Sequence, residues 1–146
     1  MKFVLDASVA IRWLVRKEQH PHADAIRRRL LGRPSGFAAP ELFLYETFSV
    51  LQRIHPQPLK VFETAVLPLV TMGVLRYPMT PGISKRAQAY CALGLRGYDA
   101  VYAALAEELG GIWLTFDSKA HRMIEARGVS CDLNAALPPG LAEPIA

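Results

Sequence analysis

The chain has 146 residues, a net charge of +4 and a hydrophobic fraction of 51%, as expected of an ordinary globular protein of one domain. No apolar run approaches the roughly 18 residues that a membrane-spanning helix needs, and Asp6 comes too early for the apolar stretch of a signal peptide. The two cysteines and four histidines lack metal-ligand spacing, so we expect free thiols in a reducing cytoplasm and no zinc site.

Short apolar strands alternate with helices along the whole chain. Pro21 opens one helix and Gly32 closes it, Pro68 kinks a later helix, and Gly128 caps the last one. In chain order, the pattern predicts a strand over residues 2–5, helices over 7–16 and 22–31, a strand over 36–39, helices over 41–54 and 58–72, a strand over 74–77, helices over 84–95 and 98–109, a strand over 112–116, a helix over 117–127 and an edge strand over 129–133.

This alternation predicts an α/β fold of three layers, in which helices flank a small, mostly parallel sheet. Because neither a linker nor an internal repeat interrupts the chain, we expect a single domain over residues 1–146. The Pro-rich end, residues 134–146, is expected to form a loose tail.

Three aspartates stand where a strand or loop gives way to a helix: Asp6, Asp99 and Asp117. Because the carboxyl ends of parallel strands line one edge of a sheet, and ligands bind in crevices there, we expect these carboxylates to converge. Clustered carboxylates repel one another unless a cation lies among them, and Mg²⁺ or Mn²⁺ is the usual cation in an all-oxygen site. The pattern therefore predicts a metal-dependent hydrolase.

Helix capping is the alternative explanation for each aspartate, because Asp is a favoured N-cap and its charge complements the helix dipole. Glu46 has no such explanation. It lies in the very apolar helix 41–54, and no basic residue stands three or four positions away, so a metal would supply the partner that its carboxylate needs. Ser8, two residues after Asp6, either supports that acid or caps the first turn of its helix.

Four motifs follow one another along the chain: Val4-Leu5-Asp6-Ala7-Ser8, Pro40-Glu41-Leu42 with Tyr45-Glu46, Tyr98-Asp99-Ala100-Val101-Tyr102, and Leu114-Thr115-Phe116-Asp117. In this order they resemble those of the PIN-domain ribonucleases, and more narrowly those of the VapC toxins of toxin–antitoxin pairs. Ser49 departs from the family pattern, because members often carry Asn three residues after the helical glutamate.

The resemblance implies a PIN-like fold with Asp6, Glu46, Asp99 and Asp117 as catalytic and metal-binding carboxylates, and with Ser8 in a supporting position. It also implies dependence on Mg²⁺ or Mn²⁺, hydrolysis of RNA phosphodiester bonds as a toxin, a homodimer, and inhibition by a small cognate antitoxin protein. In such a mechanism, metal ions activate a water for in-line attack on phosphorus, and either Asp117 or Glu46 holds or deprotonates that water.

Two other functions remain open. A phosphatase could use Asp6 as its nucleophile, although such enzymes carry a second acid at the position that Ser8 occupies here. The chain could also be a catalytically inactive PIN-like module that binds RNA or protein. Basic clusters at residues 27–29 and 119–127 suit a polyanionic partner, but taken alone they are better explained as solvated helix faces.

Helices 41–54 and 58–72 carry more apolar residues than a small sheet can cover. We therefore expect them to line an exposed groove, with Leu51 and Phe62 on its walls, that receives an amphipathic antitoxin segment. The alternative is that the two helices pack on each other in a helical subdomain.

Overall fold

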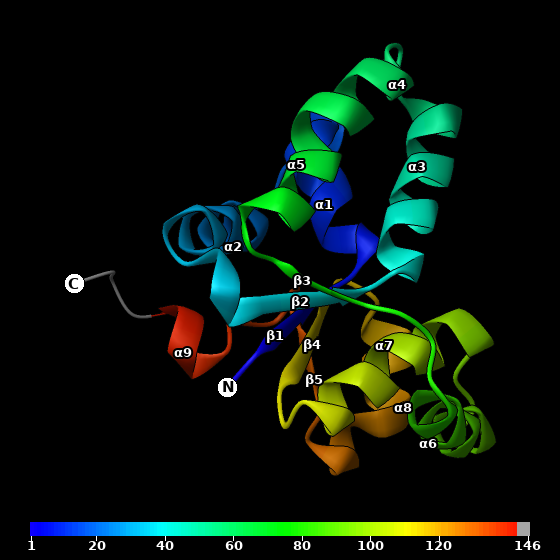
Figure 1. The fold of residues 1–146 in the computed structure, drawn as a ribbon. Helices are drawn as coiled ribbons and strands as arrows, with labels where there is room; N and C mark the ends of the chain where they lie inside the picture. The colour runs from blue at the N-terminus through cyan, green and yellow to red at the C-terminus, as the bar shows by residue number, and fades with distance from the viewer. Residues whose placement is uncertain (143–146) are drawn as a thin grey trace.

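The computed structural model describes residues 1–142, in which helices cover both faces of a five-stranded parallel sheet (Figure 1). The strand order is β3-β2-β1-β4-β5, so β5 is an edge strand as predicted. This arrangement confirms the three-layer α/β prediction, and each predicted strand is present within two residues of its expected bounds. The strands are β1 (Phe3–Leu5), β2 (Phe37–Pro40), β3 (Leu75–Tyr77), β4 (Ile112–Thr115) and β5 (Ser130–Asp132).

The helices also follow the prediction, with most ends displaced by a few residues. One face of the sheet carries the helices from α1 to α5, and the other carries α6, α7 and α8 (Figure 1). Their bounds are α1 (Ala7–Leu14), α2 (Pro21–Gly32), α3 (Leu42–Ile54), α4 (Pro58–Val61), α5 (Leu67–Met72), α6 (Pro81–Ala92), α7 (Gly97–Glu108), α8 (Ser118–Ile124) and α9 (Pro139–Ala142).

The chain leaves β1 and β4, which are neighbours in the sheet, toward opposite faces. After β1 it enters α1 on one face, and after β4 it enters α8 on the other (Figure 1). Such a switch point opens a crevice at the carboxyl ends of the two strands, where α/β proteins bind their ligands. Asp6 directly follows β1 and Asp117 comes two residues after β4, so the topology places both acids at this crevice.

Between α4 and α5 the helix widens into a π-helical segment, Phe62–Val66. Pro68 follows it in the first turn of α5. A proline within a helix has no N–H to donate, and its ring crowds the preceding turn. The predicted kink at Pro68 therefore appears as a π-helical turn, with hydrogen bonds from residue i to residue i+5, just before the proline.

The prediction that Leu51 and Phe62 line an open groove is wrong. Leu51 is 0% exposed and Phe62 is 9% exposed, and the Phe62 ring packs edge-on against Phe48 with centroids 5.3 Å apart. The helices α3 and α4, with the π-helical segment, form a hairpin whose apolar faces bury each other (Figure 1). The alternative of a helical subdomain therefore holds.

The expected loose tail is also wrong for the part of it that the structure describes. The short helix α9 packs near α2, Leu141 is buried, and Arg29 donates a hydrogen bond of 2.9 Å to the carbonyl oxygen of Gly140. Burial of one leucine and a charge-assisted hydrogen bond order this segment despite its prolines. Residues 143–146 lie outside the described residues. Within residues 1–142, no helix is both long and apolar enough to span a membrane.

Candidate active site

Asp6 is the most firmly held acid of the predicted cluster. It is 6% exposed and caps α1, with its Oδ1 accepting a hydrogen bond of 2.7 Å from the Ser8 amide and another from the Ser8 hydroxyl. Its Oδ2 accepts a hydrogen bond of 2.8 Å from the indole Nε1 of Trp113. Burial raises the pKa of Asp6 even though these hydrogen bonds lower it. The carboxylate is thus held in one orientation by neutral hydrogen-bond donors, without a cationic partner among residues 1–142.

Ser8 links the ends of two strands. Its hydroxyl donates to Asp6 and accepts a hydrogen bond of 3.1 Å from the backbone amide of Phe116, just after β4. The serine side chain therefore supports Asp6, whereas the cap of α1 is Asp6 itself, which accepts from the Ser8 backbone amide.

Glu46 reaches the same region from α3, where it is half-buried. Burial raises its pKa most, the nearby Tyr102 hydroxyl lowers it, and the negative charge of Asp6 raises it again. The charge of Asp6 acts on Glu46 although the two residues are forty positions apart in the chain, which places the helical glutamate close to the strand-end aspartate.

Asp99, in the first turn of α7, interacts with the other three predicted acids. Burial raises the pKa of Asp99 to about 6, and the negative charges of Asp117, Asp6 and Glu46 contribute in that order, while Arg96 lowers it. A carboxyl group responds in this way only when like charges lie nearby. The four acids predicted from the sequence therefore converge at one place.

Asp117 performs the capping role as well. It is the N-cap of α8, and its Oδ1 accepts a hydrogen bond of 2.9 Å from the amide of Ala120. Its own amide donates to the Thr115 hydroxyl over 3.0 Å. The capping bond uses only one carboxylate oxygen, and its charge still acts on Asp99. Capping and membership of the acidic cluster are therefore compatible.

Two buried aromatic residues at the site were not predicted. Trp113 and Tyr102 stack with centroids 6.1 Å apart and planes 11° apart, and Trp113 holds Asp6. The Tyr102 hydroxyl is buried and meets no partner at hydrogen-bonding geometry within residues 1–142. Burial raises the pKa of Tyr102 most, and the nearby charges of Asp6 and Glu46 raise it further. The spacing of Tyr102 three positions after Asp99, which puts both on one helical face, could have revealed it.

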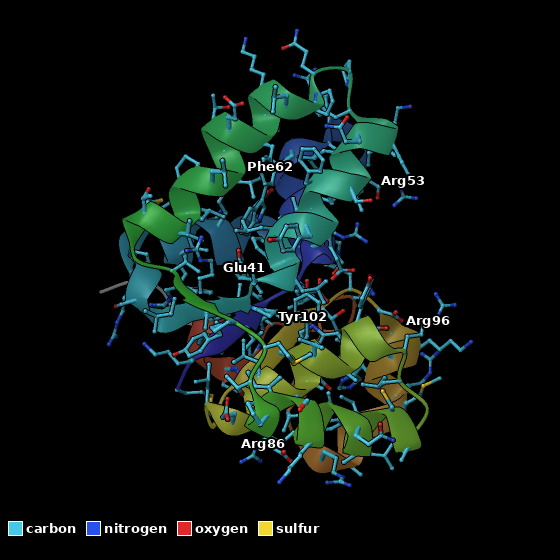
Figure 2. The ribbon with its side chains drawn as sticks, turned by 45° about the vertical axis from the view of Figure 1, so that its right-hand side comes forward. Glu41, Arg53, Phe62, Arg86, Arg96 and Tyr102 are labelled. Atoms are coloured by element: carbon cyan, nitrogen blue, oxygen red, sulfur yellow. The ribbon has the colours of Figure 1, made fainter. Side chains whose placement is uncertain are left out.

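Figure 2 shows Tyr102 between the helices above the sheet and those below it, at the level where these two halves meet. Arg53 and Arg96 lie on the same side of the molecule, Arg53 above that level and Arg96 close to it. Both arginines are exposed, and each lines a cavity that also contains acids of the cluster.

The chemistry of this cluster fits a hard divalent cation. All of the atoms that could bind a metal are carboxylate oxygens, and three of the four acids, Asp6, Glu46 and Asp99, have raised pKa values. A cation would relieve the repulsion and favour the ionised acids. Within residues 1–142, however, no three His, Cys, Asp or Glu side chains are arranged to hold a metal ion. The side chains of Asp6 and Asp117 instead turn toward their capping bonds.

Two cavities adjoin the acids. One, of about 320 Å³, is lined by Glu46 together with Tyr45, Arg53 and Tyr98. The other, of about 250 Å³, is lined by Asp99 and Asp117 together with Arg96 and Lys119. Each cavity therefore combines acids of the cluster with exposed basic side chains at its rim.

Residues 3–125 match the PIN domain family, which is more than four-fifths of the chain and includes all four acids. The chain belongs to this family. The resemblance noted in the sequence is therefore confirmed at the level of the PIN domain. No curated protein matches the chain by sequence.

Solved structures of PIN-like fold are similar to this PIN domain at low sequence identity. FitAcB from Neisseria gonorrhoeae superposes with a TM-score of 0.66 at 16% identity, over 84% of this chain and 93% of that chain. The toxin VapC20 of Mycobacterium tuberculosis, described as cleaving the sarcin–ricin loop, gives 0.63 at 14% identity, over 90% and 98%. A toxin–antitoxin complex from Klebsiella pneumoniae gives 0.59 at 16% identity, over 82% and 90%. At these identities the likeness concerns the fold.

Proposed function

We propose that this PIN domain is a metal-dependent endoribonuclease that acts as the toxin of a toxin–antitoxin pair. The proposal is supported most by Asp99, whose pKa is raised to about 6 by burial first and then by the charges of Asp117, Asp6 and Glu46. Four acids from separate segments repel one another at a sheet edge where ligands bind, and such an arrangement is stabilised when a divalent cation joins it.

In this proposal Asp6, Glu46, Asp99 and Asp117 hold Mg²⁺ or Mn²⁺. A divalent ion bound there supplies the positive charge that activates water and stabilises the negative charge developing on the scissile phosphate. Trp113 and Ser8 keep the Asp6 carboxylate in one orientation. Either Asp117 or Glu46 would hold or deprotonate the attacking water.

The test is to incubate the purified protein, free of any antitoxin, with total RNA in EDTA, MgCl₂ or MnCl₂ and to map the new RNA ends. The proposal predicts cleavage at defined positions only with metal, and none with Asp6→Asn. If RNA stays intact in both metals while the protein binds it, the chain is the inactive RNA-binding module instead. Release of phosphate from small phosphomonoesters would favour the phosphatase.

The partners follow from the same proposal. We infer that a small antitoxin protein inhibits this domain and that the domain forms a homodimer in the cytoplasm, supported by its likeness to a chain in a toxin–antitoxin complex. Co-expression with the product of a short reading frame next to its gene should yield a complex without nuclease activity. Light scattering of the free protein should give twice the mass of 16.1 kDa.

A further inference from the structure

Two exposed tyrosines stand next to the acids in both sequence and space. Tyr45 precedes Glu46 and Tyr98 precedes Asp99, and they are 66% and 65% exposed. Both line the cavity of about 320 Å³ that contains Glu46, and both line a second cavity of about 420 Å³ beside it. Within residues 1–142 neither ring packs against another aromatic ring, and neither hydroxyl makes a hydrogen bond.

The charges around these rings favour a polyanion as the ligand. Arg53 lines the cavity that contains Glu46, and Arg96 lines the cavity that contains Asp99 and Asp117. Both guanidinium groups are exposed, and neither forms a salt bridge within the described residues. Exposed cations beside both cavities of an acidic centre would contact the phosphates next to a bond being cleaved.

The aromatic rings favour a single strand. Proteins that bind single-stranded nucleic acid combine a basic groove with aromatic side chains on which bases stack. In a duplex the bases are already stacked and paired, so their faces are not accessible to a protein ring. The two cavities also differ in character, since tyrosines line one and Arg96 with Lys119 lines the other.

Building on the proposed function, we propose that single-stranded RNA crosses the acidic cluster with one base stacked on Tyr98 and Tyr45. The phosphate next to that base contacts Arg53, and the phosphate beyond the scissile bond contacts Arg96 and Lys119. The two tyrosines are then specificity-determining residues, because they select an unpaired nucleotide on one side of the cleavage position.

Binding can be measured separately from cleavage in the Asp99→Asn background, which removes one repelling charge and the proposed nuclease activity. Fluorescence anisotropy with a labelled single-stranded oligoribonucleotide, and with the same strand in a duplex, gives both affinities. Tyr45→Ala and Tyr98→Ala should each weaken single-strand binding roughly tenfold, whereas Tyr45→Phe and Tyr98→Phe keep the ring and should bind as the parent does. Arg53→Ala should weaken binding, with Arg28→Ala, an exposed arginine on α2, as its control.

Equal affinity of the parent for single strand and duplex, or unchanged affinity in both alanine variants, would overturn the stacking site. If the alanine variants bind RNA normally but change the oligomeric mass, the tyrosines belong to a protein interface and the stacking site is refuted. If the tyrosines control RNA binding and the wild-type protein cleaves no RNA, the stacking site stands and the proposed nuclease fails. Circular dichroism confirms that each variant is folded.

Discussion

Removing the charge of Asp99 should stabilise the metal-free protein at neutral pH. The folded state raises the pKa of this carboxyl from its usual value of 3.8 to about 6. Because one pKa unit corresponds to about 1.36 kcal/mol, the ionised form of Asp99 is disfavoured in the folded state by about 3 kcal/mol. Because Asp99 is partly exposed, screening lowers the expected gain of Asp99→Asn to about 1–2 kcal/mol.

The interaction of Asp99 with the helix dipole opposes this gain in stability, but it is smaller. Asp99 lies in the first turn of α7, where a negative charge complements the helix dipole by about 0.3–1 kcal/mol. Asp24 in the first turn of α2 makes the same kind of contribution outside the cluster. Asp24→Asn is therefore the matched control, and it should only destabilise.

The sign of the pH dependence follows from the raised pKa. Between pH 3.8 and about 6 the folded state binds more protons at Asp99 than the unfolded state, so this group lowers stability as pH rises through that interval. Urea denaturation in EDTA should therefore show Asp99→Asn more stable than wild type at pH 7.5, with the difference shrinking toward pH 4. If Asp99→Asn loses as much stability at pH 7.5 as Asp24→Asn does, the convergence of the acids is refuted.

Three further predictions concern the metal, the buried hydroxyl and the cap. Millimolar MnCl₂ should raise the melting temperature of wild type by several degrees, since it binds only the folded state, and Asp99→Asn should lose most of this rise; an identical rise in both proteins would mean that Mn²⁺ binds elsewhere. Tyr102→Phe should raise the pKa of Glu46 further in a carboxyl NMR titration, because the Tyr102 hydroxyl beside Glu46 lowers it; an unchanged titration of Glu46 would show that the hydroxyl does not act on this acid. Asp117→Asn should keep the cap of α8 and Asp117→Ala should cost about 1 kcal/mol, yet both should lose RNA cleavage; cleavage retained by Asp117→Asn would reduce this residue to a cap.

Local patterns were sufficient to predict the fold. Alternating strands and helices, the apolar strand over residues 112–116 and the C-capping Gly128, which adopts a left-handed conformation, all appear where the sequence indicates them. The grouping of the acids could also be predicted, because the carboxyl ends of parallel strands must share one edge of the sheet.

Features that depend on tertiary packing could not be predicted. Trp113 and Tyr102 look like ordinary core residues in the sequence, and only the pairing of β1 with β4 places the Trp113 indole beside Asp6. Leu51 and Phe62 look like an exposed surface because the sequence does not show that α3 folds back against the next helices. The order of residues 134–142 likewise depends on α2, more than a hundred positions earlier.

The most direct test of the acidic cluster as a metal site is a crystal of the protein grown with MnCl₂ and measured at the manganese absorption edge. The account predicts an anomalous peak within coordinating distance of carboxylate oxygens from at least three of Asp6, Glu46, Asp99 and Asp117. In solution, the same protein should bind Mn²⁺ by calorimetry and lose that binding with Asp6→Asn. An electron-density map that shows the four carboxylates without an anomalous peak among them at saturating Mn²⁺ would contradict the account.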